Sequence, residues 1–115
     1  MISLVILGCI KGGDFKMIRG TTPTLKFGLP FEVSLIEKAS IALSQNGSVI
    51  IDKSLDDCEV EEKTLILKLS QSETLKLRSE TDTEIQVRIR THDGTALASE
   101  IIVEDTDRIL KDGEI

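Results

Sequence analysis

The side chains of this sequence that could do chemistry are few and form no recognisable pattern. His92 is the only histidine, and it directly precedes Asp93-Gly94. A serine hydrolase would need a nucleophile elbow of the G-x-S-x-G type, which the sequence lacks. Turns favour small polar residues for conformational reasons alone. We therefore interpret His92 as part of a turn, not as a catalytic base.

The densest charged segment is acidic and covers residues 52–62. Calcium needs oxygen ligands that converge in a tight loop, but neither this segment nor "DTDRILKD" near the C-terminus has the EF-hand spacing. Paired carboxylates can hydrolyse glycosides, yet three Phe and no Trp or Tyr offer little to hold a sugar. We interpret these acids as solvated turns and strand edges, where charge prevents aggregation. They are Asp52, Asp56, Asp57, Glu59, Glu61 and Glu62.

The two cysteines, Cys9 and Cys58, have no CxxC spacing, and with a single histidine they predict no zinc site. Cys58 alternates with charged residues, which is typical of a small buried strand residue. The sequence Ile6-Leu7-Gly8-Cys9 resembles a lipoprotein cleavage box. However, no Lys or Arg precedes it, and the apolar run is too short for a signal peptide.

Composition narrows the class of protein further. The 115 residues, 40% hydrophobic and 30% charged, predict one small globular domain with no transmembrane span. A net charge of -6 argues against nucleic acid, because binding to phosphates depends on Lys and Arg. We expect a protein that is not an enzyme, has no catalytic, cofactor-binding or metal-binding residues, and contacts neither nucleic acid nor membrane.

Hydrophobic residues recur with a period of two from residue 21 onward, which indicates half-buried antiparallel strands. Asn46-Gly47 and Asp93-Gly94 predict type I′ hairpin turns, and a third reversal is expected at Glu62-Lys63. The residues expected to face inward are Leu25, Phe27, Leu29, Ile41, Leu43, Leu65, Leu67, Leu69, Ile85, Val87, Ile89, Leu97, Ser99, Ile101 and Val103.

Two further signals concern how these strands are arranged. Pro23 and Pro30 bracket the first of them, which suits an edge strand. Ser70 and Glu73 have the spacing of a capping box, so a single helical turn is expected to carry the chain between sheets. Together these features predict an all-β fold, an immunoglobulin-like antiparallel β-sandwich of about seven strands with one short helical turn.

We expect three regions along the chain: residues 1–16, a β-sandwich over residues 17–104, and an acidic tail over residues 105–115. The segment "KGGD" can be encoded by a near-complete ribosome-binding sequence upstream of Met17, so we interpret residues 1–16 as a translated leader or a disordered extension. The alternative is a real N-terminal strand, "SLVILGCI", at the edge of the domain. The tail is expected to fray or form a short helix, or to dock Ile109, Leu110 and Ile115 on a neighbouring subunit.

The segments "MIRGTTPTLKFGLPF", "LSQNGSVIIDKSLDDCEVEEKTLILKLSQSETLKL" and "IQVRIRTHDGTALAS" together span most of residues 17–115. They resemble a family of short proteins encoded in phages and prophages of Gram-positive bacteria, which typically open with MIRGTTPT. The strand pattern is more remotely similar to the immunoglobulin-like N-terminal domain of phage baseplate upper proteins.

This resemblance implies a structural protein of the phage tail or baseplate, without catalytic chemistry. Its expected partners are other phage structural proteins, or further copies in a homo-oligomer, and its expected location is the virion or the cytoplasm of a bacterial host. Gly20, Thr21, Thr22 and Pro23 could either form an assembly contact or only set the entry into the first strand. The alternative function is a module that binds carbohydrate or the host surface through its loops.

Overall fold

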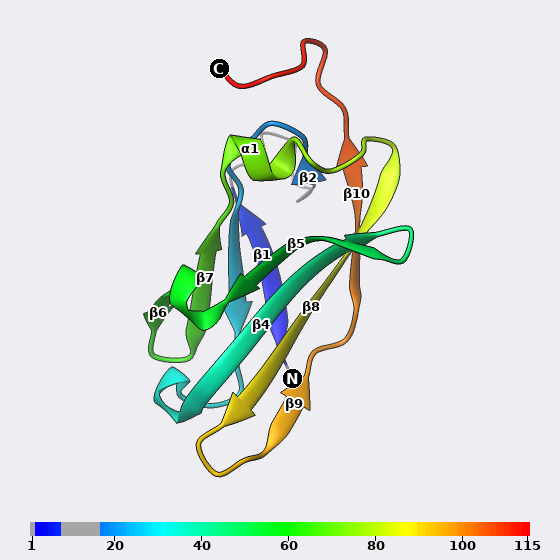
Figure 1. The fold of residues 1–115 in the computed structure, drawn as a ribbon. Helices are drawn as coiled ribbons and strands as arrows, with labels where there is room; N and C mark the ends of the chain where they lie inside the picture. The colour runs from blue at the N-terminus through cyan, green and yellow to red at the C-terminus, as the bar shows by residue number, and fades with distance from the viewer. Residues whose placement is uncertain (1, 8–16) are drawn as a thin grey trace.

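Two β-sheets pack face to face in the computed structural model, which describes residues 2–7 and 17–115 (Figure 1). Sheet A contains, in spatial order, β1 (Ser3–Leu7), β3 (Thr24–Gly28), β7 (Thr64–Lys68) and β6 (Glu59–Glu61). Sheet B contains β2 (Met17–Ile18), β10 (Ile102–Asp107), β8 (Thr81–Thr91), β4 (Ile36–Gln45) and β5 (Ser48–Ser54). A short strand, β9 (Ala96–Ala98), pairs with β8.

The strand order confirms the predicted immunoglobulin-like sandwich. Its arrangement places strands A, B, E and D in one sheet and strands G, F and C in the other, with C′ added beside C in variable domains. Here β1, β3, β7 and β6 occupy the first set of places, and β10, β8, β4 and β5 occupy the second. The seven strands expected from the sequence are β3 to β8 and a last strand, which the structure divides into β9 and β10.

The period of two correctly placed the core over most of the chain. Its inward positions on β3, β4, β7 and β8 are almost completely buried, and Phe27 has no exposed surface. Burying side chains of this size contributes about 1.5–3 kcal/mol each, so this interior supplies most of the favourable free energy of folding. The residues confirmed as buried are Leu25, Phe27, Leu29, Ile41, Leu43, Leu65, Leu67, Leu69, Ile85, Val87 and Ile89.

The expectation that β3 is an edge strand was wrong, because β1 lies outside it. The five residues of β1 pair antiparallel with β3, from Ser3 opposite Gly28 to Leu7 opposite Thr24. Ile6 is only 2% exposed and joins the core. For residues 3–7 the structure thus agrees with the alternative of an N-terminal strand at the domain's edge. Whether translation starts at Met1 or Met17 stays a prediction, and residues 8–16 lie outside the described part.

The final strand was predicted on the wrong face over part of its length. Four residues of this strand were expected to face inward, and only Ser99 is buried. Leu97, Ile101 and Val103 are 39%, 54% and 53% exposed. The irregular residues between β9 and β10 shift the alternation, so that Ile102 pairs with the buried Ile85 and turns inward instead. A one-residue shift moves every later side chain of a strand to the other face.

Ser99 keeps the chain hydrogen-bonded to β8 at the interruption between β9 and β10. The Ser99 N–H donates to the carbonyl of Val87 (2.8 Å), and the Val87 N–H donates to Ser99 Oγ (3.0 Å). The side chain therefore takes the place of a backbone acceptor at a buried position.

Replacing Ser99 by Ala should destabilise the fold by about 1–3 kcal/mol, because the Val87 N–H loses its acceptor in a buried position. Urea unfolding followed by circular dichroism measures the change. Ser40→Ala is the control, since Ser40 lies exposed on β4 and should change stability by less than about 0.5 kcal/mol. Equal effects of the two substitutions would contradict the role given to Ser99.

The predicted turns are present, with one difference in type. Asn46 and Gly47 have φ angles of 51° and 79°, as a type I′ turn requires. Glu62 has φ 46° at the reversal between β6 and β7. At Asp93-Gly94 only the glycine has a positive φ, 88°. The Gly94 N–H donates to the Thr91 carbonyl, so the β8–β9 hairpin has a longer loop than a two-residue I′ turn.

The predicted helical turn is α1 (Gln71–Thr74), and it carries the chain from sheet A to sheet B. Ser70 and Glu73 form the expected capping box. Glu73 also forms an ion pair with Lys53 of β5. The hydrogen bond between these two side chains raises the pKa of Lys53 above its ordinary value. Two 3₁₀ turns complete the described elements: η1 (Val33–Leu35) and η2 (Leu55–Asp57).

The C-terminal tail begins later than expected, because β10 continues to Asp107 and buries Thr106. Residues 108–115 form neither helix nor strand. Leu110 and Ile115 are fully exposed, whereas Ile109 is half-buried. Among the described residues, no helix has the length and apolar character needed to cross a membrane.

Candidate functional site

The residues that suggested chemistry from the sequence are dispersed in the structure. His92 is exposed in the turn between β8 and β9, and its backbone N–H donates to the Leu35 carbonyl (3.0 Å). Cys9 and Phe15 lie outside the described residues. Within residues 2–7 and 17–115, no three His, Cys, Asp or Glu side chains come close enough to hold a metal ion.

The acids of residues 52–62 are all exposed, as expected of solvated turns and edges. Glu59 and Glu61 lie on β6, the outer strand of sheet A. Asp57 of η2 accepts a hydrogen bond from the N–H of Ser54, the residue just before η2 (2.9 Å). That bond lowers the pKa of Asp57, which fits a capping role.

Cys58 differs from its prediction as a buried strand residue. It lies just after η2 and before β6, and its side chain is only partly buried. Burial, together with the negative charge of Asp57, raises the pKa of the thiol to about 11. Because the thiolate is the reactive form of cysteine, Cys58 is a weak nucleophile at neutral pH.

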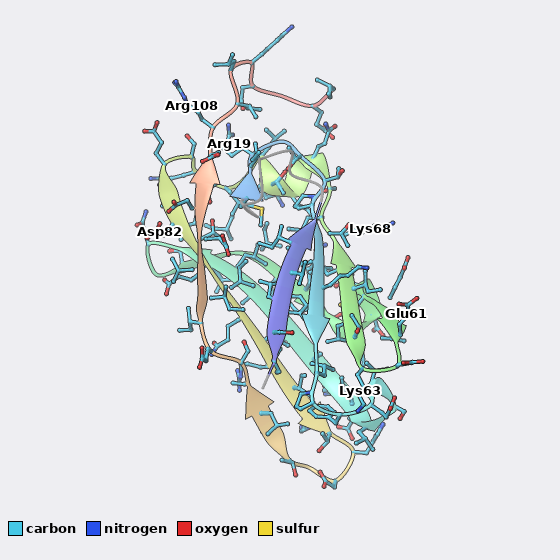
Figure 2. All side chains as sticks on the ribbon, turned by 180° about the vertical axis from the view of Figure 1, so that it is seen from behind. Arg19, Glu61, Lys63, Lys68, Asp82 and Arg108 are labelled. Carbon is cyan, nitrogen blue, oxygen red and sulfur yellow. The ribbon has the colours of Figure 1, made fainter. Side chains whose placement is uncertain are left out.

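Arg19 of the opening motif MIRGTTPT, labelled in Figure 2, contacts two distant parts of the chain. Its guanidinium donates to the carbonyls of Leu77 (2.6 Å) and Leu75 (2.9 Å), which follow α1. The same group forms an ion pair with Asp112 in the C-terminal tail (2.7 Å). Hydrogen bonds from a charged donor are worth more than neutral ones, so Arg19 fixes the chain after α1 against β2.

The residues after Arg19 also make internal contacts. Gly20 has φ 73°, and a Cβ there would lie 3.0 Å from the Ile109 side chain. The Thr21 carbonyl accepts a hydrogen bond from Thr74 Oγ1 (2.7 Å), and the carbonyl of the buried Pro23 accepts one from the Leu69 N–H (3.0 Å). These contacts agree with the explanation that the motif sets the entry into the first strand, and the alternative of an assembly contact stays a prediction.

A pair of carboxylates that sequence reasoning missed lies across two strands. Asp82 of β8 is directly opposite Asp105 of β10, and Figure 2 shows Asp82 beside β10. A hydrogen bond between the two carboxyl groups raises the pKa of Asp82, and the charges of Asp105 and Glu84 raise it further. Sequence reasoning could not find this pair, because the two residues are 23 positions apart and meet only through the pairing register of β8 and β10.

Replacing Asp82 by Asn should raise the melting temperature at pH 7. The folded-state pKa of Asp82 is raised, so the favourable contribution of its protonated form is present at low pH and lost as pH rises through that pKa. The gain should therefore shrink toward pH 3, which thermal unfolding at several pH values can measure. Asp52→Asn removes one exposed charge from β5 and is the control; an equal gain there would contradict a specific pair effect.

The open edges of the two sheets differ in charge. In sheet A, β6 carries Glu59 and Glu61, and Figure 2 shows Glu61 at the opposite side of the sheet from β1. In sheet B, the long edge strand β5 carries Asp52 and Lys53. Strand β1, "SLVIL", has no charged residue and no proline. Among described edge strands of five residues or more, it alone lacks the charges that protect an edge from pairing.

The comparison with known proteins adds no family. A scan against models of protein families finds no match, and a search of the curated proteins finds no similar sequence.

Proposed function

We propose that this chain is a non-enzymatic structural protein of a phage or prophage, associated with the tail or baseplate, that acts by protein-protein assembly. The resemblance of residues 17–115 to phage and prophage proteins that open with MIRGTTPT supports the origin. The sandwich supports the mode of action, because its sheets offer edges to other chains. The expected location is the virion, or the bacterial cytoplasm before assembly.

The observation that carries the assembly part of this proposal is the uncharged edge of β1. An edge strand presents unpaired backbone N–H and C=O groups, which are a template for pairing with another chain. Recognition by added strands draws its affinity from such main-chain hydrogen bonds and its specificity from alternate side chains. At β1 these side chains are Ser3 and the 41% exposed Val5.

Peptide mass spectrometry on phage particles tests the proposal. The prophage is induced in its native host, and particles are separated from free protein. Enrichment of this chain in particles would support a virion component, whereas its absence from particles whose other proteins are well covered would overturn it. The first peptide also separates the two start sites: a peptide beginning at Met17 or Ile18 supports a leader, and peptides that cover residues 1–16 exclude one.

A further inference from the structure

The outer face of sheet B carries a charge pattern along β8 that changes sign about its middle residue. On this strand, buried residues alternate with residues that point away from the sandwich. The outward side chains are, in order, Asp82, Glu84, Gln86, Arg88 and Arg90. Two acids therefore precede a neutral glutamine, and two arginines follow it. One end of the face is negative and the other end is positive.

The neighbouring strands extend the charge at both ends. Asp105 of β10 lies directly opposite Asp82, and Lys38 of β4 lies directly opposite Arg90. Like charges that oppose each other across two strands are destabilising. An ion pair with Glu37 offsets part of this charge at Arg90. Within one chain, each end of the face thus gathers side chains of one sign at a cost in stability.

The inner pair of charges has no ion pair within the described part of the chain. Neither Glu84 nor Arg88 lies within ion-pair distance of an opposite charge there. The residues directly across from them on β4 are Ser44 and Ser40, which are uncharged. A partner that brings an acid to Arg88 and a base to Glu84 would therefore complete the face.

The surface beside these charges is suited to close approach by another sheet. On β4 the outward residues across from the centre of β8 are Ser40, Ala42 and Ser44, and β9 adds Ala96 and Ala98 beside the arginines. Such short side chains permit the spacing of about 10 Å at which sheets stack. In Figure 1, β4, β5 and β8 lie in front of sheet A, so the view is onto this face.

We propose that this face binds the same face of a second copy of the chain, with the two β8 strands antiparallel and crossing at Gln86. In such a two-fold dimer each contact occurs twice. Arg88 of each copy then faces Glu84 of the other, and Arg90 faces Asp82. The inference rests on the proposed mode of action, protein-protein assembly, and it names a further copy of the chain as one partner. The surface is separate from the β1 edge, which belongs to sheet A.

The extent of the face predicts a weak dimer. Eight residue pairs join β4 and β8. With about 3.3 Å per residue and about 4.8 Å between strands, four strands of this length cover about 500 Å² on each copy. Specific interfaces begin at about 1,000 Å² for both partners together. Asp52 of β5 lies level with Gln86 but at the rim, where solvent screens it from its counterpart. We therefore expect dimers that form as concentration rises and dissociate at high salt.

Charge reversal at the inner pair tests this arrangement by loss and rescue. Arg88→Glu places two acids opposite each other in both contacts, and Glu84→Arg places two bases there. Each variant alone should therefore raise the dissociation constant of the dimer at least about tenfold. An equimolar mixture of the two variants should dimerise again, because each chain then meets the opposite charge in both contacts. The double variant E84R/R88E should also dimerise by itself.

Sedimentation of the full chain in reducing buffer, over a range of concentrations at low salt, measures these dimers. Lys68→Glu is the matched control, because it makes the same change in net charge at an exposed position of β7 in sheet A. It should leave the dimer unchanged. An unaltered chain that stays monomeric at every concentration would overturn the inference. So would a mixture of the two single variants that stays monomeric, or a loss with Lys68→Glu as large as with Arg88→Glu.

The outcome can be separated from that of the proposed function. A chain that is enriched in phage particles but never dimerises overturns the face-to-face dimer alone. A dimer that follows the charge rules above, from a chain that is absent from particles, overturns the proposed function alone.

Discussion

Replacing Gln45 by Ala should destabilise the protein by about 2–4 kcal/mol, because it leaves several buried polar groups without partners. Gln45 is 3% exposed at the end of β4. Its Nε2 donates to the Arg78 carbonyl (2.9 Å) and to Thr83 Oγ1 (3.1 Å). Its Oε1 accepts from the Arg78 N–H (2.8 Å). One side chain thus satisfies both backbone groups of a residue in the segment between α1 and β8.

The cost should exceed that of a single hydrogen bond because the network continues inside the sandwich. Thr83 and Thr106 are buried, and their hydroxyl groups lie 2.5 Å apart. Loss of the Gln45 amide therefore also removes a donor from the Thr83 hydroxyl. Domains of this size are stable by about 5–15 kcal/mol, so the change is a large fraction of the total.

Gln86→Ala is the matched control for Gln45→Ala. Gln86 lies half-buried on β8, and its amide makes one hydrogen bond to the Ser99 carbonyl (3.1 Å). Its loss should cost about 0.5–1.5 kcal/mol. Urea unfolding of both variants, followed by circular dichroism since the chain has no Trp or Tyr, compares them. A Gln45→Ala cost no larger than that of Gln86→Ala would show that the network does not stabilise the sandwich.

The sequence predicted the parts of the fold that depend on neighbours along the chain. The period of two identified the core strands because one face of each is buried. Asn46-Gly47 and the Ser70–Glu73 pair act within a few residues, so their hairpin and capping box could be read directly. The sandwich class followed from the number and spacing of such elements.

The parts that were missed depend on contacts between distant segments. The period of two places Gln45 on the inward face with Ile41 and Leu43, but Arg78 is 33 positions away, and nothing local identifies it as the partner of Gln45. The same holds for Asp82 and Asp105, whose opposition depends on the register of β10. Ser99 was expected to face inward, but the change of phase after it reversed the faces of Ile101 and Val103.

The N-terminal strand was set aside for a different reason. An edge strand was the alternative, but the ribosome-binding sequence that can encode residues 11–14 favoured a leader. The prediction that β3 is an edge strand depended on Pro23 and Pro30, which bracket it, and it left no place for a strand before Met17. The hydrophobic residues of "SLVIL" give no clear alternation, since Val5 between Leu4 and Ile6 is also apolar, so no period separated its buried face from its exposed one.

Replacing Ile6 by Ala should therefore destabilise the full chain by about 2–4 kcal/mol, the range for removing a buried Ile side chain from a packed core. Ile6 is 2% exposed, and the β1–β3 ladder holds it in place. The free energy comes from lost apolar contact and from the cavity left beside β3.

Val5→Ala is the control, because Val5 is adjacent on the same strand but 41% exposed on the other face. Its cost should stay below about 1 kcal/mol. Urea unfolding at low protein concentration measures both variants against the unaltered chain. A large difference between them places β1 in the folded domain with Ile6 inward. If both substitutions have equally small effects, β1 contributes nothing to the stability of the core. That result would favour the interpretation of residues 1–16 as a leader.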